Sequence, residues 1–224
     1  GSSGELKMAE TLLSMGQVDR ALTLLKKLRQ IKPEDPSILN NLATAYVRKN
    51  QMNEAFQIYN EAIDIHGDYF LLHFNLGTAY ELSGDRERAL NHFDRVLELR
   101  PTMSRALQRR AMLLSDLGRH DEALTAIEEA IMAGAGTAQM SFYAGLIKGS
   151  KGKWLEAVRE FETAINIDPR MVRSYLFLGH ALIELNRFDE AAKAFSVAES
   201  YDAKRADISS ARKRLSLLGF DLKE

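Results

Sequence analysis

The segment from Phe70 to Met103 alternates apolar and polar residues at helical spacing. In its first half, Leu76, Gly77 and Tyr80 fall on one face, because residues three to four positions apart lie on the same side of a helix. Ser83-Gly84-Asp85 follows as a turn, since glycine adopts positive φ and aspartate caps a following helix. The pattern predicts one amphipathic helix that ends at this turn.

The second half of the segment repeats the same apolar spacing. Ala89, Phe93 and Val96 share one helical face. Pro101 ends the unit because proline has no N–H and restricts the residues before it. The whole segment therefore predicts two amphipathic helices joined by a turn.

This two-helix pattern recurs at a fixed interval of 34 residues, without insertion or deletion. The six copies run from Ser2 to Asp35, Pro36 to Tyr69, Phe70 to Met103, Ser104 to Thr137, Ala138 to Met171 and Val172 to Arg205. Such regularity predicts one elongated array in which each unit contacts mainly its neighbours.

Small and large residues occupy fixed positions in the copies. The residues at position 8 are Ala9, Ala43, Gly77, Ala111, Gly145 and Gly179, and those at position 20 are Ala21, Ala55, Ala89, Ala123, Ala157 and Ala191. Position 24 is always large and apolar: Leu25, Tyr59, Phe93, Ile127, Phe161 and Phe195. Small residues let two helix backbones approach, and the large side chain fills the space beside them.

These positions resemble the tetratricopeptide repeat, a helix-turn-helix unit of about 34 residues. The resemblance implies an all-α, right-handed superhelical solenoid of six repeats. Some residues depart from the family pattern. No copy has Trp at position 4, Arg110 stands at position 7 of the fourth copy, and Lys148 stands at position 11 of the fifth. The fourth and fifth repeats are therefore the least regular.

Both ends of the chain differ from the repeats. Gly1-Ser2-Ser3-Gly4 resembles a cloning scar, so we expect the natural sequence to begin near Glu5 and to be a fragment of a longer protein. Residues 206–219 carry an apolar stripe, which predicts a capping helix that stops at Gly219 and is followed by a tail, 220–224. A basic cluster opposes the stripe and serves either as a solvated face or as a site for an acidic partner: Arg212, Lys213 and Arg214.

One stretch without charge, Ala130 to Ile147, reaches the length of a membrane span. It contains three glycines and polar residues, and the repeat register continues through it. We therefore expect a loop between the fourth and fifth repeats and no direct membrane insertion.

Composition agrees with a helical protein: 46% of the 224 residues are apolar and 27% are charged. The net charge of −1 gives no general attraction to nucleic acid, so no nucleic-acid partner is expected. The chain has no cysteine, which excludes disulfides, thiolate zinc sites and thiol catalysis but leaves the compartment undecided.

No catalytic, cofactor or metal site is expected. The five histidines show no pairing at helical spacing, which a zinc or di-iron site on helices needs; they are His66, His73, His92, His120 and His180. The chain also has no phosphate-binding glycine loop, nucleophile elbow or HExxH motif.

The resemblance implies that function comes from a concave groove lined by the first helix of each repeat. Its polar, positive part is predicted to contain Asn40, Asn41, Thr44, Arg48, Asn75, Thr78, Arg105, Gln108 and Arg109. Its apolar, aromatic part is predicted to contain Phe142, Tyr143, Leu146, Leu176 and Phe177, joined by Arg173 and His180. The aromatic residues either dock a partner or pack against the next helix, and Phe74 and Met112 interrupt the division.

Clustered Asn and Arg suit an acidic or carboxylate-bearing peptide through charge-assisted hydrogen bonds. The carboxylate clamp of family co-chaperones is matched only in part: Asn75 and Arg109 agree, Arg105 keeps the charge, and Asn40 and Thr44 depart. The sequence is therefore interpreted as a protein-protein interaction scaffold that binds a peptide or partner segment. Two rivals stay open, the repeat arm of a larger enzyme and a self-assembling structural subunit, and the oligomeric state is unknown.

Overall fold

The computed structural model describes residues 2–202 and 206–219. Gly1, the predicted end of the sixth copy at Arg205 and the predicted tail 220–224 lie outside these residues. The chain forms two compact units, Gly1–Arg110 and Ala111–Glu224.

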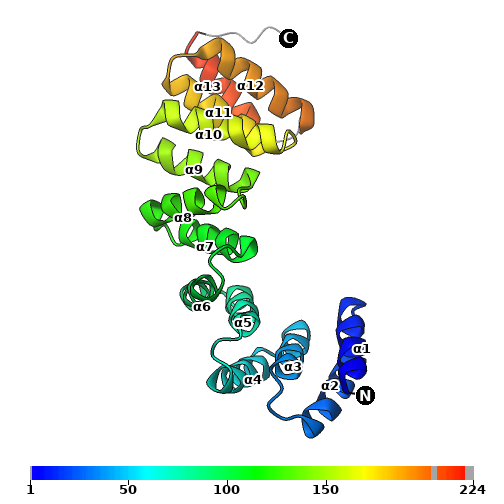
Figure 1. Ribbon diagram of the computed structural model, residues 1–224. Helices are drawn as coiled ribbons and strands as arrows, with labels where there is room; N and C mark the ends of the chain where they lie inside the picture. The colour runs from blue at the N-terminus through cyan, green and yellow to red at the C-terminus, as the bar shows by residue number, and fades with distance from the viewer. Residues whose placement is uncertain (1, 203–205, 220–224) are drawn as a thin grey trace. The chain divides into compact units, whose positions relative to one another are not determined.

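The described residues form thirteen α-helices and no strand (Figure 1). The helices are α1 (Ser2–Ser14), α2 (Val18–Ile31), α3 (Pro36–Arg48), α4 (Met52–Ile65), α5 (Phe70–Leu82), α6 (Arg86–Leu99), α7 (Ser104–Asp116), α8 (His120–Met132), α9 (Ala138–Ser150), α10 (Trp154–Ile167), α11 (Val172–Glu184), α12 (Phe188–Tyr201) and α13 (Ala206–Leu217). The prediction of an all-α chain is confirmed.

The helices begin at regular intervals. The odd-numbered helices α1 to α13 begin at residues 2, 36, 70, 104, 138, 172 and 206, which are 34 residues apart. The even-numbered helices α2 to α12 begin at residues 18, 52, 86, 120, 154 and 188, with the same spacing. Consecutive helices pack together as pairs, for example α3 with α4, α5 with α6, and α11 with α12. Each of these pairs is therefore one helix-turn-helix unit.

The turn inside every pair holds one residue with positive φ. These residues are Gly16, Asn50, Gly84, Gly118, Gly152 and Asn186, with φ between 58° and 87°. Glycine, and less readily asparagine, tolerates this left-handed conformation. Beyond Gly84, the side chain of Asp85 accepts a hydrogen bond from the Arg88 N–H at 3.0 Å, as expected for an N-cap. The predicted turn and cap at these residues are confirmed.

The small residue at position 8 and the large residue at position 24 meet in the three helix pairs that carry glycine at position 8. Every side chain at position 24 is buried, and Phe93 and Phe195 have no exposed surface. A Cβ atom added at Gly145 would lie 2.6 Å from Cε1 of Phe161, and one added at Gly179 would lie even closer to Phe195. Glycine thus stands at position 8 where position 24 is phenylalanine, because the ring fills the space that a methyl group would need.

The two departures from the family pattern are polar contacts between helices. Arg110 of α7 donates from Nε to Oδ1 of Asp94 on α6 at 2.8 Å. Lys148 of α9, which is 19% exposed, donates to Oε1 of Glu160 on α10 at 2.6 Å. A partly buried cation gains from such a partner, which offsets its loss of hydration. These repeats therefore replace apolar packing with ion pairs.

The uncharged stretch from Ala130 to Ile147 is divided in the structure. Helix α8 ends at Met132 and α9 begins at Ala138, so a loop interrupts the stretch. Within the part of the chain that the structure describes, no helix has the length and apolar character needed to cross a membrane.

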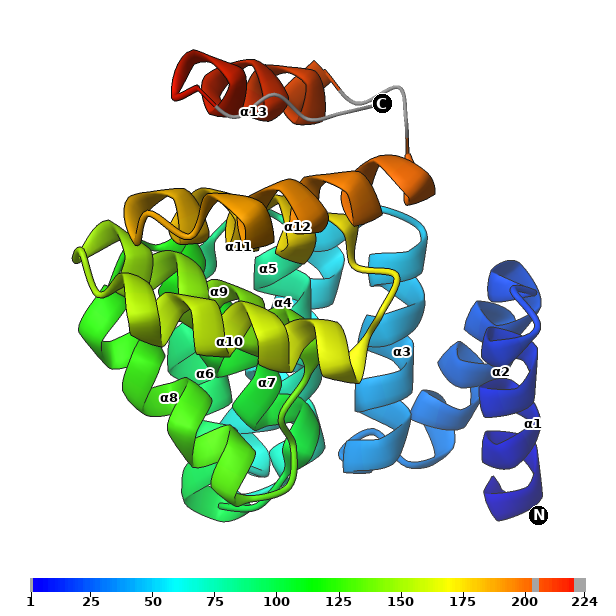
Figure 2. The ribbon, with the colours of Figure 1, turned by 90° about the horizontal axis from the view of Figure 1, so that it is seen from above.

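Helix α13 packs on the last helix pair. Its apolar residues Ile208, Ala211 and Leu215 are buried in the same cluster as Phe195, and Figure 2 shows α13 alongside α12. Gly219 has φ of +87°, as its predicted role as a stop requires.

The basic cluster of α13 is largely engaged within the chain. Arg212 pairs with Glu199 and Arg214 pairs with Glu184, each at 2.5 Å. Carboxylates of neighbouring helices therefore already pair with two of the three basic residues that could bind an acidic partner.

Ala157 of α10 lies at the close contact between the two helices of the fifth repeat. It is fully buried, and its Cβ would lie 3.8 Å from a Cβ added at Gly149 of α9. We expect Ala157→Leu to destabilise the fold by about 1–3 kcal/mol, because extra methylenes overpack this contact. Thermal unfolding followed by circular dichroism measures the effect, with Arg159→Leu on the exposed face of α10 as the control. Equal melting temperatures for the two variants would contradict this packing.

Candidate partner-binding surface

In the first unit, the polar row begins with a hydrogen-bonded pair of asparagines. Asn75 of α5 donates from Nδ2 to Oδ1 of Asn40 on α3 at 2.8 Å. Asn40 is only 8% exposed, so the expectation that it is an exposed groove residue is wrong. Its carboxamide instead orients Asn75, which is partly exposed. The neighbouring Asn41 donates to Oε1 of Glu10 at 3.2 Å.

The two threonines of the row are held by their own helices. Thr44 donates to the Asn40 carbonyl at 2.8 Å, and Thr78 donates to the Phe74 carbonyl at 2.9 Å. Because Thr44 has used its hydrogen, the Tyr59 hydroxyl donates to it at 2.9 Å. Burial raises the pKa of Tyr59, so this hydroxyl stays protonated near neutral pH. These threonines shape the surface and offer it only acceptor lone pairs.

The arginines of the row differ in their availability. Arg48 donates to the carbonyl of Leu13. Arg109 donates from Nη1 to both carboxylate oxygens of Glu81, at 2.9 and 3.0 Å. Arg105 is exposed and has no ion-pair partner among the described residues. The neighbouring Gln108 is partly buried and has contacts of its own.

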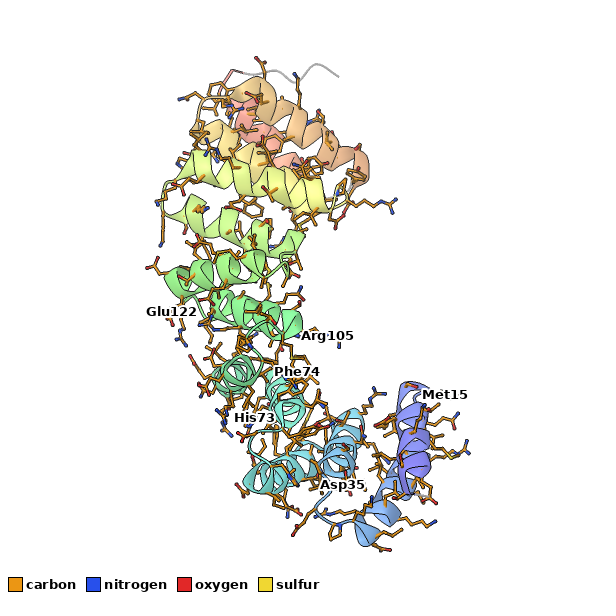
Figure 3. The ribbon with its side chains drawn as sticks, viewed as in Figure 1. Met15, Asp35, His73, Phe74, Arg105 and Glu122 are labelled. Carbon is orange, nitrogen blue, oxygen red and sulfur yellow. The ribbon has the colours of Figure 1, made fainter. Side chains whose placement is uncertain are left out.

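Phe74 lies beside this polar row. Figure 3 shows Phe74 and Arg105 on one side of α5 and α7, with His73 on the other side of α5. The Phe74 ring is partly exposed and meets Phe93 edge-on, with ring centroids 5.5 Å apart. This side of the first unit therefore combines an aromatic ring with an available guanidinium group, and the oriented carboxamide of Asn75 follows Phe74 on the same helix.

In the second unit, the predicted aromatic part is mostly core. Phe142 is 2% exposed, and its ring lies 5.9 Å from Phe161 and 5.5 Å from Phe177. Of the two roles left open by the sequence, packing against the next helix fits Phe142, because the ring fills the space between α9, α10 and α11. Phe177 is partly exposed, and the Arg173 guanidinium lies over the Phe142 ring at 4.8 Å.

The remaining predicted residues of this part border the same cluster. Leu176 is 4% exposed, which makes it a core residue. Tyr143 and Leu146 are partly buried against the cluster. The His180 ring lies 6.2 Å from Phe177 and 5.5 Å from Phe195. Burial, helped by the charge of Arg214, lowers the pKa of His180, so it is neutral at pH 7.

Sequence spacing missed one pair of histidines. His73 and His92 are 19 positions apart, yet their Nδ1 atoms lie 3.1 Å from each other. They sit at positions 4 and 23 of the third repeat, so an alignment of helix pairs in space would have brought them together. Among the described residues, no group of three or more His, Asp or Glu side chains is arranged to hold a metal ion.

Family comparisons agree with the helix pairs. Models described as "Tetratricopeptide repeat" match residues 5–34 and 34–102, and a further one matches 80–141 and 150–215. The last of these alone covers more than half of the chain, so the chain belongs to the tetratricopeptide repeat family.

Individual relatives are more distant. "Protein FlbA" of Caulobacter vibrioides is 28% identical over 163 residues, which is 70% of this chain and 27% of that protein. The C-terminal part of a repeat protein from Cytophaga hutchinsonii has a TM-score of 0.79 at 13% identity, covering 96% of this chain and 89% of that one. YrrB, described as a TPR protein with an unusual peptide-binding site, has a TM-score of 0.74 at 17% identity, covering 84% and 97%. The two structures share the fold.

Proposed function

We propose that this chain is a protein-protein interaction scaffold whose first unit binds an extended, acidic segment of a partner. The observation that supports it best is Arg105, an exposed cation without an ion-pair partner among the described residues, on the same side of the helices as Phe74. Family membership supports the general role, since tandem repeats present side chains of successive helices along one surface. The peptide-binding site described for YrrB, which shares the fold, agrees with this role.

The chemistry of the row favours an acidic segment. The Arg105 guanidinium forms charge-assisted hydrogen bonds with a carboxylate, in bidentate geometry where the segment allows. Asn75 is already oriented by Asn40, so its carboxamide loses little conformational freedom on binding a peptide backbone. Phe74 offers apolar area beside them.

A clamp for a chain terminus is less well supported. Arg109, which the family clamp would use, already binds both oxygens of Glu81. Asn40, at another clamp position, is buried. We therefore propose that internal Asp and Glu side chains of the partner, rather than its terminal carboxylate, carry the recognition. A peptide with an amidated C-terminus should then bind as well as one with a free carboxylate.

Arg105 is the residue whose loss should matter most. We expect Arg105→Ala to weaken binding of an amidated, Asp- and Glu-rich peptide by about tenfold or more, since a charge-assisted hydrogen bond contributes about 1.5–3 kcal/mol. Arg109→Ala should have the smaller effect because Arg109 is bound to Glu81 and makes no direct contact with the segment. The double variant loses the Arg105 contact and also leaves the Glu81 carboxylate free to repel the segment, so it should abolish binding. Added salt should weaken binding by the wild-type protein.

Fluorescence anisotropy with a labelled peptide measures these affinities. Arg159→Ala, an exposed arginine on α10 of the second unit, is the matched control for loss of one charge. Circular dichroism checks that each variant is folded. If the double variant binds the peptide, or a partner isolated later, as tightly as the wild type does, the proposed surface is wrong.

A further inference from the structure

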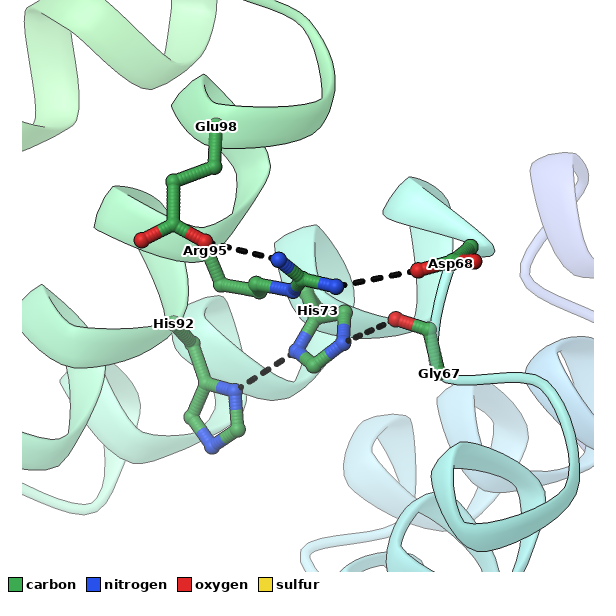
Figure 4. A network of polar contacts seen from close by, with 6 residues as sticks. All are labelled: Gly67, Asp68, His73, His92, Arg95 and Glu98. Atoms are coloured by element: carbon green, nitrogen blue, oxygen red, sulfur yellow. Dashed lines mark hydrogen bonds and ion pairs between the residues drawn. The ribbon is translucent and has the colours of Figure 1, made fainter.

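His73 and His92 connect the two helices of the third repeat to the loop that precedes them. His73 lies on α5, and its Nδ1 faces Nδ1 of His92 on α6 at 3.1 Å (Figure 4). On its other side, His73 Nε2 lies 3.0 Å from the carbonyl oxygen of Gly67, in the loop that precedes α5. The His73 imidazole therefore connects this loop to the contact between α5 and α6.

The carbonyl oxygen of Gly67 determines which ring nitrogens carry hydrogen when both histidines are neutral. A carbonyl only accepts, so His73 Nε2 carries the hydrogen and donates it. The Nδ1 of neutral His73 is then an acceptor, and Nδ1 of His92 must donate to it. The contact needs one hydrogen between the two Nδ1 atoms. When both rings are protonated, two N–H groups face each other and the hydrogen bond is lost.

The charges near His73 act in opposite directions. The positive charge of Arg95 opposes protonation of His73, whereas the charges of Asp68 and Glu98 favour it. The nearby carboxylates are engaged by Arg95: Asp68 at 2.9 Å and Glu98 at 2.7 Å. His73 itself is only 7% exposed.

The other face of His92 meets an aromatic ring. The Tyr80 ring is stacked on His92 with centroids 5.5 Å apart, and the Arg88 guanidinium lies over Tyr80 at 5.1 Å. The charged groups around the pair are therefore Arg88, Arg95, Asp68 and Glu98, and none of them makes a hydrogen bond or ion pair with either imidazole among the described contacts.

We propose that the His73–His92 contact is an acid-sensitive joint, which holds α5 against α6 and the Gly67 loop when neutral and releases α5 when both imidazoles are protonated. Helix α5 also carries Phe74 and Asn75. If the proposed function is correct, acidification therefore weakens partner binding at the first unit. The release of α5 itself does not depend on that function.

The direction of the pH effect follows from proton binding. Burial lowers the pKa of His73, and burial together with the neighbouring His73 lowers the pKa of His92 to about 4. The unfolded chain, with histidine pKa values near 6.5, then binds more protons than the folded chain below that pH. Stability is fully present above about pH 6.5 and is lost as the pH falls toward 4. His92 alone should raise the opening equilibrium constant on the order of tenfold between pH 7.5 and 5.0.

Hydrogen exchange of the full chain, read by mass spectrometry at pH 7.5 and 5.0, tests the joint. Protection factors are corrected for intrinsic exchange and compared between pH 7.5 and pH 5.0. In residues 70–99 we expect this fall in protection to be on the order of tenfold larger in the wild type than in His92→Gln. The Gln amide donates to His73 without titrating at these pH values. His92→Phe is a second variant that keeps a ring against Tyr80, and because the readout is a pH dependence, its absolute stability does not matter.

His120 provides the control. It is exposed at the start of α8, so His120→Gln should keep the wild-type pH dependence in residues 70–99. Equal pH dependence of protection in the wild type, His92→Gln and His92→Phe would overturn the joint. Loss of this pH dependence in His120→Gln would also overturn it. Peptide binding measured at both pH values is a separate readout. An unchanged affinity together with the expected exchange would contradict the proposed binding surface and leave the joint supported.

Discussion

Gly179→Ala is expected to lower the free energy of unfolding by up to about 2 kcal/mol, because overpacking costs about 1–3 kcal/mol and the higher helix propensity of alanine offsets about 1 kcal/mol of it. The added methyl group would lie less than 3.0 Å from three ring atoms of Phe195. Phe195 is fully buried, so its ring has no open space into which to move. Overpacking should therefore exceed the gain of about 1 kcal/mol from helix propensity. Urea unfolding followed by circular dichroism measures the difference.

Two comparisons isolate the contact with Phe195. Gly77→Ala occupies the same repeat position, but its nearest contacts would be 3.3 Å, so we expect a change near zero. Phe195→Leu removes the ring that the added methyl group would meet. Gly179→Ala should therefore cost less stability in the Phe195→Leu background than in the wild type. If Gly179→Ala proved as stable as Gly77→Ala, the described packing of α11 on α12 would be incorrect.

Phe142→Ala is expected to destabilise the second unit by roughly 3–5 kcal/mol, because a buried aromatic ring leaves a cavity when it is removed. Its ring contacts Phe161 and Phe177 and supports the Arg173 guanidinium. Phe177→Ala should cost less, since Phe177 is partly exposed. The fluorescence of Trp154, the chain's only tryptophan, reports unfolding of this unit.

The same two variants separate core residues from docking residues. If Phe177 contacts a partner, Phe177→Ala should weaken partner binding at temperatures where the variant is folded. Phe142→Ala should affect binding only as far as it unfolds the unit. A Phe142→Ala protein with wild-type stability would show that its ring is not part of the core.

The fold could be predicted because its determinants are local and repeated. The turn at Gly84, the cap at Asp85 and the buried ring of Phe93 each follow from residue types at fixed spacing, and the pattern recurs in every copy. Small residues at position 8 predicted close helix contacts, and the short distance between Gly145 and Phe161 agrees.

The candidate surface was harder to predict because it depends on pairings between helices. The spacing of Arg109 and Glu81 along the chain gives no sign that they form an ion pair. Asn40 occupies a groove position but is covered by its neighbours, and Phe142 occupies one but fills the core. The identity of a side chain predicts its chemistry. Whether that side chain is available to a partner depends on which residues of the adjacent helix lie beside it.

Helix α13 begins where a seventh repeat would begin, but it carries a charged residue at a position that faces the second helix in the repeats. Lys213 is exposed at position 8, where all six repeats carry glycine or alanine. A helix packed there would bury an ammonium group, at a cost of several kcal/mol unless an acidic side chain accompanied it. The charge of Lys213 therefore opposes the packing of an apolar helix on this face of α13.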